Sequence, residues 1–386
     1  MKFSGYRRPD GRVGTRNYVG VLSTVVCANE VARGIADKVA GSVAFSHQQG
    51  CCQTPPDLTR VTQALCGLAC NPNLASVLLI GLGCEGTRMP EIEEAVRACG
   101  KRVETLMIQE EGGAAKTTAK GVLLTQEMAG EASRLKPVDC GPEDLVLGLK
   151  CGSSDTTSGL ASNPSLGVTV EKMVDENASV VMGEVTEFIG AEHIMADHAK
   201  DEATGRKILD LVERMENRAK MAGVDMRGGQ PTPGNIAGGL TTIEEKSLGA
   251  IAKAGNAVVQ EVYEYGERPK VKGLVVMDSP GREPELLTGL AAAGCNVIVF
   301  TTGRGAPQGF PFVPVIKVTG NEKTWHHLRD HMDLSVHGVM DGSQTLGQAG
   351  ELIYRAVEEV ASGALTKAEL SGYVQAMDIY VTGPVI

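Results

Sequence analysis

Short apolar runs alternate with stretches of helical spacing along most of the chain, and this alternation limits the possible fold more than any other feature. In the first half, apolar runs at 17–26, 42–45, 76–80 and 103–108 are each followed by a helical pattern. The second half repeats the alternation, with apolar runs at 145–149, 179–182, 257–262, 273–277, 296–301 and 314–318. Such alternation is typical of βαβ units, in which helices cover parallel strands. We therefore predict an α/β protein of two Rossmann-like domains, with mainly parallel sheets in three α/β/α layers.

The length of the chain and a connector near its middle indicate where it divides. The chain has 386 residues, which is beyond the size at which a single hydrophobic core usually stops growing. The stretch 136–142, Lys-Pro-Val-Asp-Cys-Gly-Pro, combines proline with glycine as connectors do. We predict an N-terminal α/β domain at 1–138 and a C-terminal α/β domain at 139–386.

Composition and charge exclude several classes of protein. The net charge is −10 and aromatic residues make up 4% of the chain, so we predict no nucleic-acid partner. No apolar run approaches the roughly 18 residues of a membrane span, and none has the form of a secretory signal, so we predict no membrane partner. Ten cysteines without such a signal are typical of a reducing compartment, and we expect a cytoplasmic protein.

Three cysteines follow predicted strands, on the loops where open α/β sheets place their ligands. These are Cys51, Cys84 and Cys151, each surrounded by Gly, Gln, His, Glu, Ser or Asp rather than by apolar residues. Their thiols could bind a metal or act in catalysis, and the alternative is burial as small apolar residues. For the cysteines without such neighbours we predict burial: Cys27, Cys66, Cys70, Cys99, Cys140 and Cys295.

Other loops that follow strands carry polar side chains suited to an organic acid. Those after the run 145–149 are Ser153, Ser154, Asp155 and Asn163. Gly303 and Arg304 follow the run 296–301, where glycine leaves backbone N–H groups accessible and arginine can bind a carboxylate through two hydrogen bonds. The alternative for Arg304 is a solvated side chain on a glycine-rich turn.

Candidate general bases lie in the second half of the chain. Glu184 and Glu187 follow the run 179–182, with His193 shortly after them, and these side chains could supply a base or metal ligands. The other histidines are predicted at surface or structural positions: His198, His326, His327, His331 and His337.

Lys246 is a further candidate because of its place in a predicted helix. Thr242 and Glu245 form a capping-box pattern that starts a helix, and Lys246 falls in its first turn. A cation is disfavoured beside the positive end of a helix dipole. The position therefore suggests an anionic partner, such as a substrate carboxylate.

Taken together, these ordered motifs resemble the altronate dehydratase/galactarate dehydratase family over nearly the whole chain. The motifs that carry the resemblance lie at 5–17, 50–51, 81–85, 151–155, 158–159, 163–164, 184–187, 233–235, 245–249 and 301–305. Two departures stand out. Cys151 is followed by Gly-Ser-Ser-Asp where the family pattern has Gly-Gly-Ser-Asp, and Cys51 is followed by a second cysteine, Cys52.

The resemblance implies an activity and a partner. Family members eliminate water from a sugar acid to give a 2-keto acid, and the large subunit of sulfolactate sulfo-lyase, which eliminates sulfite, is similar. Full-length members carry a small N-terminal domain with no counterpart here, so the resemblance implies a large subunit that works with a separate small subunit in an oligomer. The competing hypotheses are a non-catalytic sugar-acid-binding subunit, a zinc-stabilised structural protein, and a catalytic cysteine without metal.

The resemblance also implies iron or another divalent metal, which would act as a Lewis acid. Cys51, Cys84 and Cys151 offer soft ligands, and three thiolates could hold either one iron or a four-iron cluster. Further possible ligands are His47 and Glu85. The predicted base is His193, Glu184, Glu187 or Lys246. Arg304 and the Ser153–Ser154 loop are predicted to bind the substrate carboxylate.

Overall fold

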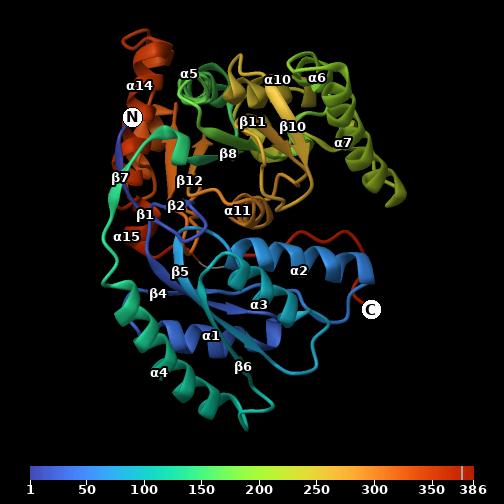
Figure 1. The fold of residues 1–386 in the computed structure, drawn as a ribbon. Helices are drawn as coiled ribbons and strands as arrows, with labels where there is room; N and C mark the ends of the chain where they lie inside the picture. The colour runs from blue at the N-terminus through green and yellow to red at the C-terminus, as the bar shows by residue number, and fades with distance from the viewer. Residues whose placement is uncertain (375–376) are drawn as a thin grey trace.

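The computed structural model describes residues 1–374 and 377–386, and it is organised around two parallel sheets. Figure 1 shows a lower, blue body that contains a four-stranded sheet and an upper, green to orange body that contains a seven-stranded sheet. Each described strand pair within these two sheets is parallel. The predicted α/β class with mainly parallel, three-layered sheets is confirmed.

The N-terminal sheet has the strand order β4-β3-β5-β6. Its strands are β3 (Tyr18–Ser23), β4 (Ser42–Phe45), β5 (Leu74–Gly81) and β6 (Arg102–Met107). Apolar side chains of α1 (Asn29–Ala36) and α4 (Ala114–Ala132) pack on one face, whereas those of α2 (Pro55–Ala69) and α3 (Met89–Ala98) pack on the other. Burial on both faces explains why these strands appear in the sequence as nearly continuous apolar runs.

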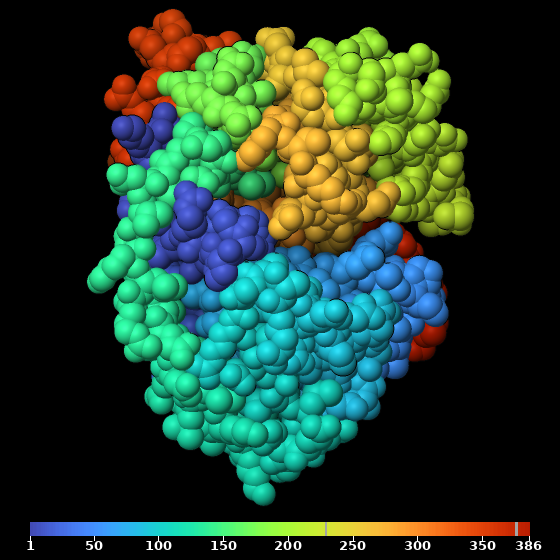
Figure 2. Space-filling model, in the orientation of Figure 1, coloured from blue at the N-terminus to red at the C-terminus, as the bar shows by residue number. Residues whose placement is uncertain are grey.

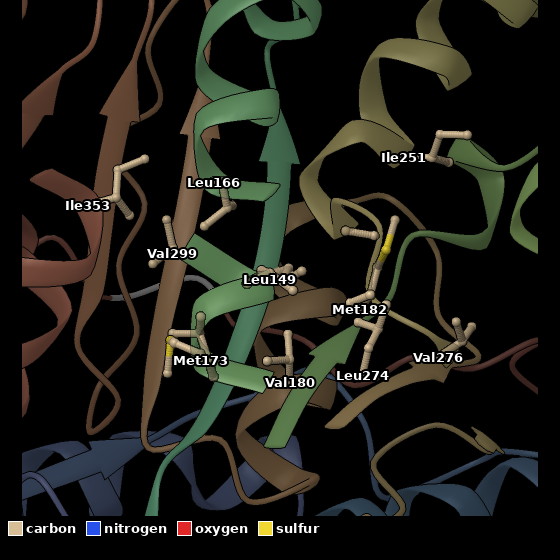
Figure 3. Packing of buried hydrophobic residues seen from close by; sticks show 14 of the residues in the cluster. Leu149, Leu166, Met173, Val180, Met182, Ile251, Leu274, Val276, Val299 and Ile353 are labelled. Atoms are coloured by element: carbon tan, nitrogen blue, oxygen red, sulfur yellow. The ribbon is translucent and has the colours of Figure 1, made fainter. Parts of the chain in front are cut away.

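The C-terminal sheet has the order β10-β11-β9-β8-β12-β13-β14. Its strands are β8 (Val146–Gly152), β9 (Ser179–Met182), β10 (Val259–Tyr263), β11 (Gly273–Met277), β12 (Val297–Thr302), β13 (Val315–Thr319) and β14 (Leu334–Ser335). Figure 3 shows Leu149 and Val299 of this sheet packed against Leu166 and Met173 of α5 (Asn163–Asp175). The opposite face is covered by α11 (Glu283–Ala292), which also contacts α2.

The two bodies share one hydrophobic core cluster where α2 meets α11. The approach is closest at Gly67, where a Cβ would lie 2.4 Å from the backbone oxygen of Ala292. Any larger residue at Gly67 would push the helices apart. The N-terminal sheet and the C-terminal sheet are therefore joined by packed apolar side chains.

The ends of the chain cross between the bodies. β1 (Phe3–Arg7) pairs antiparallel with β2 (Val13–Gly14) and with β7 (Val138–Cys140), so the predicted boundary at 138/139 falls within a strand. The C-terminal tail returns to the N-terminal body, where Val385 forms a β-bridge with Gln53.

The remaining elements are mostly short helices. The α-helices are α6 (Glu192–Asp197), α7 (Glu202–Met221), α8 (Met226–Gly229), α9 (Pro233–Ala237), α10 (Ile243–Ile251), α12 (Glu322–His327), α13 (Gly338–Asp341), α14 (Leu346–Ala361) and α15 (Lys367–Ser371). The short 3-10 helices are η1 (Val26–Ala28), η2 (Pro142–Asp144), η4 (Val185–Glu187) and η5 (Ala252–Ala254), and η3 (Ser158–Ser162) is a π-helix. No helix within residues 1–374 and 377–386 combines the length and apolar character needed to cross a bilayer.

Strand order fixes where each sheet opens a crevice. In the C-terminal sheet, β9 pairs with one edge of β8 and β12 pairs with the other edge, so the strand order reverses direction between β8 and β12. In the N-terminal sheet, the strand order reverses in the same way between β3 and β5. Ligands of open α/β sheets bind at such reversals, outside the carboxyl ends of the strands.

Candidate functional site

A cavity of about 550 Å³ lies beyond the carboxyl end of β8, between η3 and α10. Its lining consists of Ser154, Asp155, Thr156, Ser158, Gly159, Leu160, Asn163, Leu240, Thr242, Glu244, Glu245, Lys246, Leu248, Gly249 and Ala250. Four of the predicted site residues, Ser154, Asp155, Asn163 and Lys246, are among them. The volume is within the range that small-molecule sites usually have.

Two glycines bring the walls of the cavity together. A Cβ added at Gly159 of η3 would lie 3.1 Å from the Cα of Gly249 in α10, and one added at Gly249 would lie 3.0 Å from the Cα of Gly159. η3 is a π-helical turn, a form that occurs often at functional sites. These contacts explain why Ser158-Gly159 and Leu248-Gly249 both belong to the sequence motifs.

Behind the cavity lies a network of buried charges. Glu184 forms ion pairs with Lys150 at 2.5 Å and with Lys253 at 3.0 Å, and all three side chains are at most 1% exposed. Lys253 also lies 3.4 Å from Glu187, and Lys246 Nζ lies 4.0 Å from the other oxygen of Glu187. Through Lys246, which also lines the cavity, the network reaches the space where a substrate would bind.

The two glutamates of the network have opposite pKa shifts. Burial alone would raise the pKa of Glu184, but the ammonium groups of Lys150 and Lys253 outweigh it and hold the pKa below its ordinary value. Burial raises the pKa of Glu187, and the negative charge of Glu184 adds to the rise. Neighbouring carboxyl groups with diverging pKa values are typical of sites where one stays charged and the other exchanges protons.

The backbone is strained on the loops that carry these groups. In the described residues, Ser153 (φ 49°), Glu184 (φ 66°) and Cys52 (φ 53°) are three of the four residues other than glycine with positive φ. Ser153 lies just beyond β8, Glu184 lies just beyond β9, and Cys52 lies on the loop after β4. Such conformations cost free energy and are concentrated at functional sites. The Glu184 carboxylate is in turn fixed by the backbone N–H of Cys151, which donates to it at 2.9 Å.

Asp155 organises the loop of the cavity rather than offering a free carboxylate. One oxygen accepts hydrogen bonds from Thr157 at 2.7 Å and from the backbone and side chain of Ser158, and the other accepts one from Asn321 at 2.7 Å. Gly303 leaves room for it, since a Cβ there would lie 2.2 Å from the Asp155 carboxyl group. The predicted substrate-binding residues Asp155 and Gly303 therefore shape the loop together.

Asn163 is likewise held by protein partners. Its Nδ2 donates to the backbone oxygen of Gly249 at 2.8 Å, and its Oδ1 accepts from Thr301 at 2.5 Å. It therefore joins α5, α10 and β12 at the end of the cavity.

Arg304 lies exposed beside the site rather than in the cavity lining. Its backbone N–H donates to Ser153 at 3.0 Å, and its guanidinium donates to the backbone oxygen of Gly234 at 2.8 Å. Ser153 is also exposed. Arg304 thus ties the loops after β8 and β12 to α9.

The three predicted cysteines are distributed over both sheets. Cys151 ends β8 and is fully buried, with its Sγ 3.3 Å from the Ser154 hydroxyl and 3.4 Å from Asn163 Nδ2. Burial raises the pKa of the Cys151 thiol, and the nearby Glu187 carboxylate adds to the rise.

Cys51 and Cys84 lie on loops of the other sheet, beyond β4 and β5. Cys84 is exposed, and Cys51 Sγ lies 3.6 Å from Cys52 Sγ. Glu85 accepts hydrogen bonds from Thr24 and from the Gly83 backbone. Within residues 1–374 and 377–386, no group of three or more His, Cys, Asp or Glu side chains is arranged to hold a metal ion. The residues as placed do not fit the predicted three-cysteine iron site.

His47 has a structural environment. It is fully buried, one ring nitrogen lies 3.0 Å from the Ser23 backbone oxygen, and the other accepts from the Gln49 backbone N–H at 3.2 Å. Burial lowers its pKa to about 4. Both nitrogens are engaged by the protein, and the role of His47 as a metal ligand stays a prediction.

His193 is exposed on α6 and is not among the residues that line the cavity or form the charge network. The structure therefore does not bring this predicted base to the site. The two lysines that sequence reasoning missed are Lys150 and Lys253. Lys150 could have been found as a single charge inside an otherwise apolar strand, since buried charges are rare unless paired. Lys253 has no comparable signal.

Comparison with known proteins agrees with the motifs. Residues 142–383 match the family model described as D-galactarate/altronate dehydratase, C-terminal. Residues 5–133 match that of D-galactarate dehydratase/altronate hydrolase, second domain. Both sheets fall within these matched segments.

Individual relatives are similar over nearly the whole chain. A (2R)-sulfolactate sulfo-lyase subunit beta of Chromohalobacter salexigens is 38% identical, with 96% of this chain and 95% of that protein covered. Altronate dehydratases of Bacillus subtilis and Escherichia coli are 35% and 33% identical, covering 96% and 95% of this chain and 76% and 75% of those proteins. The chain belongs to the D-galactarate/altronate dehydratase family and is an enzyme of the lyase class.

Proposed function

We propose that this chain is the large subunit of an altronate-type dehydratase, which removes water from a sugar acid by α,β-elimination to give a 2-keto acid. The observation that carries the proposal is the position of Lys246. It is the one basic side chain among the described residues that line the cavity, and it lies 4.0 Å from the buried Glu187. Elimination next to a carboxylate requires removal of a poorly acidic C–H proton, and a positioned acid–base pair supplies this.

Lys246 is the proposed catalytic base, and Glu187 is a positioning residue beside it. Burial raises the pKa of Glu187, which favours a proton on that carboxyl group. Gln230 accepts a hydrogen bond from Lys246 Nζ at 3.2 Å and directs it. In the proposed step the Lys246 amine takes the proton at C2 of the substrate. Glu184 stays charged between Lys150 and Lys253 and keeps the proton on Glu187 by repulsion.

The charges of the lining favour a substrate with one carboxylate. The cavity offers one ammonium group against three carboxyl groups, those of Asp155, Glu244 and Glu245. A dianion such as sulfolactate or galactarate would bring a second negative charge toward these carboxylates, which costs free energy. Hydroxyl groups of Ser154, Thr156, Ser158 and Thr242 also line the cavity and suit the hydroxyls of a sugar acid. An aldonic acid such as altronate meets both conditions.

Sulfite elimination from sulfolactate is the second candidate, and one observation favours it. The chain covers 95% of the sulfo-lyase subunit beta but only 76% of the B. subtilis altronate dehydratase. The chain thus matches nearly the whole of a protein that is named as one subunit of a sulfo-lyase. For either activity we propose a separate partner subunit, because that relative is named as subunit beta. The cytoplasm is the proposed compartment.

Iron, which the family resemblance implies, would act as a Lewis acid toward the substrate hydroxyl. Among the described residues, no group of three or more His, Cys, Asp or Glu side chains is arranged to hold such an ion. The proton transfer proposed for Lys246 uses only side chains of this chain.

The experiment is a product assay on the enzyme purified, with its bound partners, from cells that make it. Altronate, galactarate and (2R)-sulfolactate are supplied separately, and 2-keto acid and sulfite are quantified. We expect 2-keto acid from altronate, lost about 100-fold or more in Lys246→Met and retained in Lys220→Met, an exposed lysine of α7. Sulfite from sulfolactate would instead establish the second candidate. Product formation from any acid at the wild-type rate in Lys246→Met would overturn the proposed role of Lys246.

A further inference from the structure

Two cysteines that the proposed function does not use lie at the ends of neighbouring helices. Cys70 is the C-cap of α2 and Cys99 is the C-cap of α3, and these helices pack against each other. Both side chains are half-buried, so small solutes can reach them. Cys70 Sγ donates to the backbone oxygen of Ala95 at 3.3 Å, and the backbone N–H of Cys99 donates to the same oxygen at 3.2 Å. The shared acceptor places the two cysteines next to each other.

Positive groups surround the Cys99 sulfur. Arg12 Nη2 donates to Cys99 Sγ at 3.3 Å. The Lys101 amino group, two residues along the chain, is buried nearby and donates to the Asn71 backbone oxygen at 2.5 Å; burial lowers its pKa to about 7. The Asp10 carboxylate opposes this charge in part, since it pairs with Arg12 at 2.6 Å. On balance the site favours a sulfur anion at Cys99.

The acidities of the two thiols differ accordingly. The hydrogen bond from Cys70 lowers the pKa of Cys99 to about 6, with Arg12 and Lys101 adding to the fall against the effect of burial. The same hydrogen bond and burial raise the pKa of Cys70. By contrast, burial raises the pKa of Cys66, one helical turn before Cys70, to about 11. One member of the pair is a thiolate at neutral pH while its partner keeps its proton.

We propose that Cys99 and Cys70 form an oxidisable dithiol, in which Cys99 is attacked first by a hydroperoxide and Cys70 then closes a disulfide. In the first step the Cys99 thiolate attacks one oxygen of hydrogen peroxide and the O–O bond breaks, which forms a sulfenic acid. The other oxygen leaves as hydroxide and takes a proton from solvent to give water. In the second step the Cys70 sulfur attacks that sulfenic acid, and its thiol proton leaves with the hydroxyl as a second water. The dithiol loses two electrons and the peroxide gains them.

The disulfide would change the junction of the two bodies. It would join the ends of α2 and α3 and remove the anion that Arg12 binds. Arg12 belongs to the segment between β1 and β2, and Figure 2 shows the dark-blue N-terminal part of the chain between the upper and lower bodies on the left of the view. The proposal does not depend on the identity of the substrate.

Peptide mapping by mass spectrometry tests the proposal on the full enzyme. Under hydrogen peroxide we expect a disulfide that links Cys70 to Cys99, reversed by dithiothreitol. In Cys70→Ser, a sulfenic acid should persist at Cys99 and react with dimedone, and in Cys99→Ser no label or disulfide should form at Cys70. Cys140→Ser, a substitution in β7 away from the pair, should leave the disulfide unchanged.

A second measurement needs no variant. At pH 7, iodoacetamide should label Cys99 of the wild-type protein at least about tenfold faster than Cys66, because only the thiolate reacts. Equal labelling of Cys99 and Cys66, or oxidation of the exposed Cys52 and Cys84 while Cys70 and Cys99 remain unlinked, would overturn the proposal.

Discussion

Lys150 Nζ lies 2.5 Å from Glu184 Oε1 inside the protein, and neither side chain is more than 1% exposed. Lys253 binds the other carboxylate oxygen at 3.0 Å, so Glu184 is shared between two ammonium groups. Burial of such charges is costly unless each has a partner, and here each lysine is paired with the shared carboxylate. The same Glu184 carboxylate accepts the Cys151 backbone N–H at the end of β8.

Removing one member of this ion pair should be costly. We expect Lys150→Met to lower the free energy of unfolding by about 3–5 kcal/mol, because part of the Glu184 charge is left buried without its partner. Urea denaturation followed by circular dichroism measures the change. The double variant Lys150→Met/Glu184→Gln should lose less than the sum of the two single variants. Strict additivity would show that the pair is not coupled.

The close approach of η3 and α10 gives a second prediction. Gly249→Ala should destabilise the protein by about 1–3 kcal/mol and weaken substrate binding, because the added methyl group would lie 3.0 Å from the Cα of Gly159 and push the cavity walls apart. Gly130→Ala in α4 is the matched control, since no atom lies within 4 Å of the added methyl group. It should be neutral or stabilising by up to about 1 kcal/mol. Equal effects of the two substitutions would argue against steric contact in the cavity wall.

Buried His47 predicts a particular dependence of stability on pH. Burial lowers its pKa from an ordinary value of 6.5 to about 4, so the unfolded chain binds a proton that the folded protein does not accept between these values. The contribution of His47 is therefore present above pH 6.5 and is lost as the pH falls toward 4, by about 3 kcal/mol in total. His47→Gln should flatten the curve of unfolding free energy over this window. The exposed His327→Gln should leave the slope as in the wild type, and a flat wild-type curve would contradict the assignment.

Glu187 should affect catalysis through its contact with Lys246. Glu187→Gln removes the titratable carboxyl group beside Lys246, so we expect kcat to fall about 10²–10⁴-fold with little change in KM. Glu187→Asp should keep part of the activity. Steady-state kinetics from pH 6 to 9 would show this, because the raised pKa of Glu187 should shape the pH profile of the wild type and not that of Glu187→Gln. A loss that is equal at every pH would point to a purely structural role.

The sequence predicted the positions of most sheet strands along the chain, for a physical reason. Strands buried on both faces are apolar throughout, as Leu147 and Leu149 of β8 are, and their periodicity needs no tertiary information. The loops at the carboxyl ends were likewise located correctly, which placed Ser154, Asp155 and Lys246 at the cavity.

The features that the sequence could not show depend on tertiary packing. Cys51, Cys84 and Cys151 all follow strands, but the first two belong to a different sheet from the third, and strand-end position says nothing about the distance between sheets. His47 looked like a ligand because the sequence does not show that the Ser23 backbone binds its ring. The pairing of Lys253 with Glu184 depends on tertiary packing in the same way.

Exchange of the substrate C2 proton with solvent deuterium tests the central claim most directly. The enzyme with its bound partners is incubated with altronate in deuterium oxide, and proton NMR follows the C2 signal together with product formation. The account predicts that wild type exchanges or eliminates the C2 proton, whereas Lys246→Met binds altronate but leaves the signal intact. Loss of the C2 proton at the wild-type rate in Lys246→Met would contradict it and assign the proton transfer to another group.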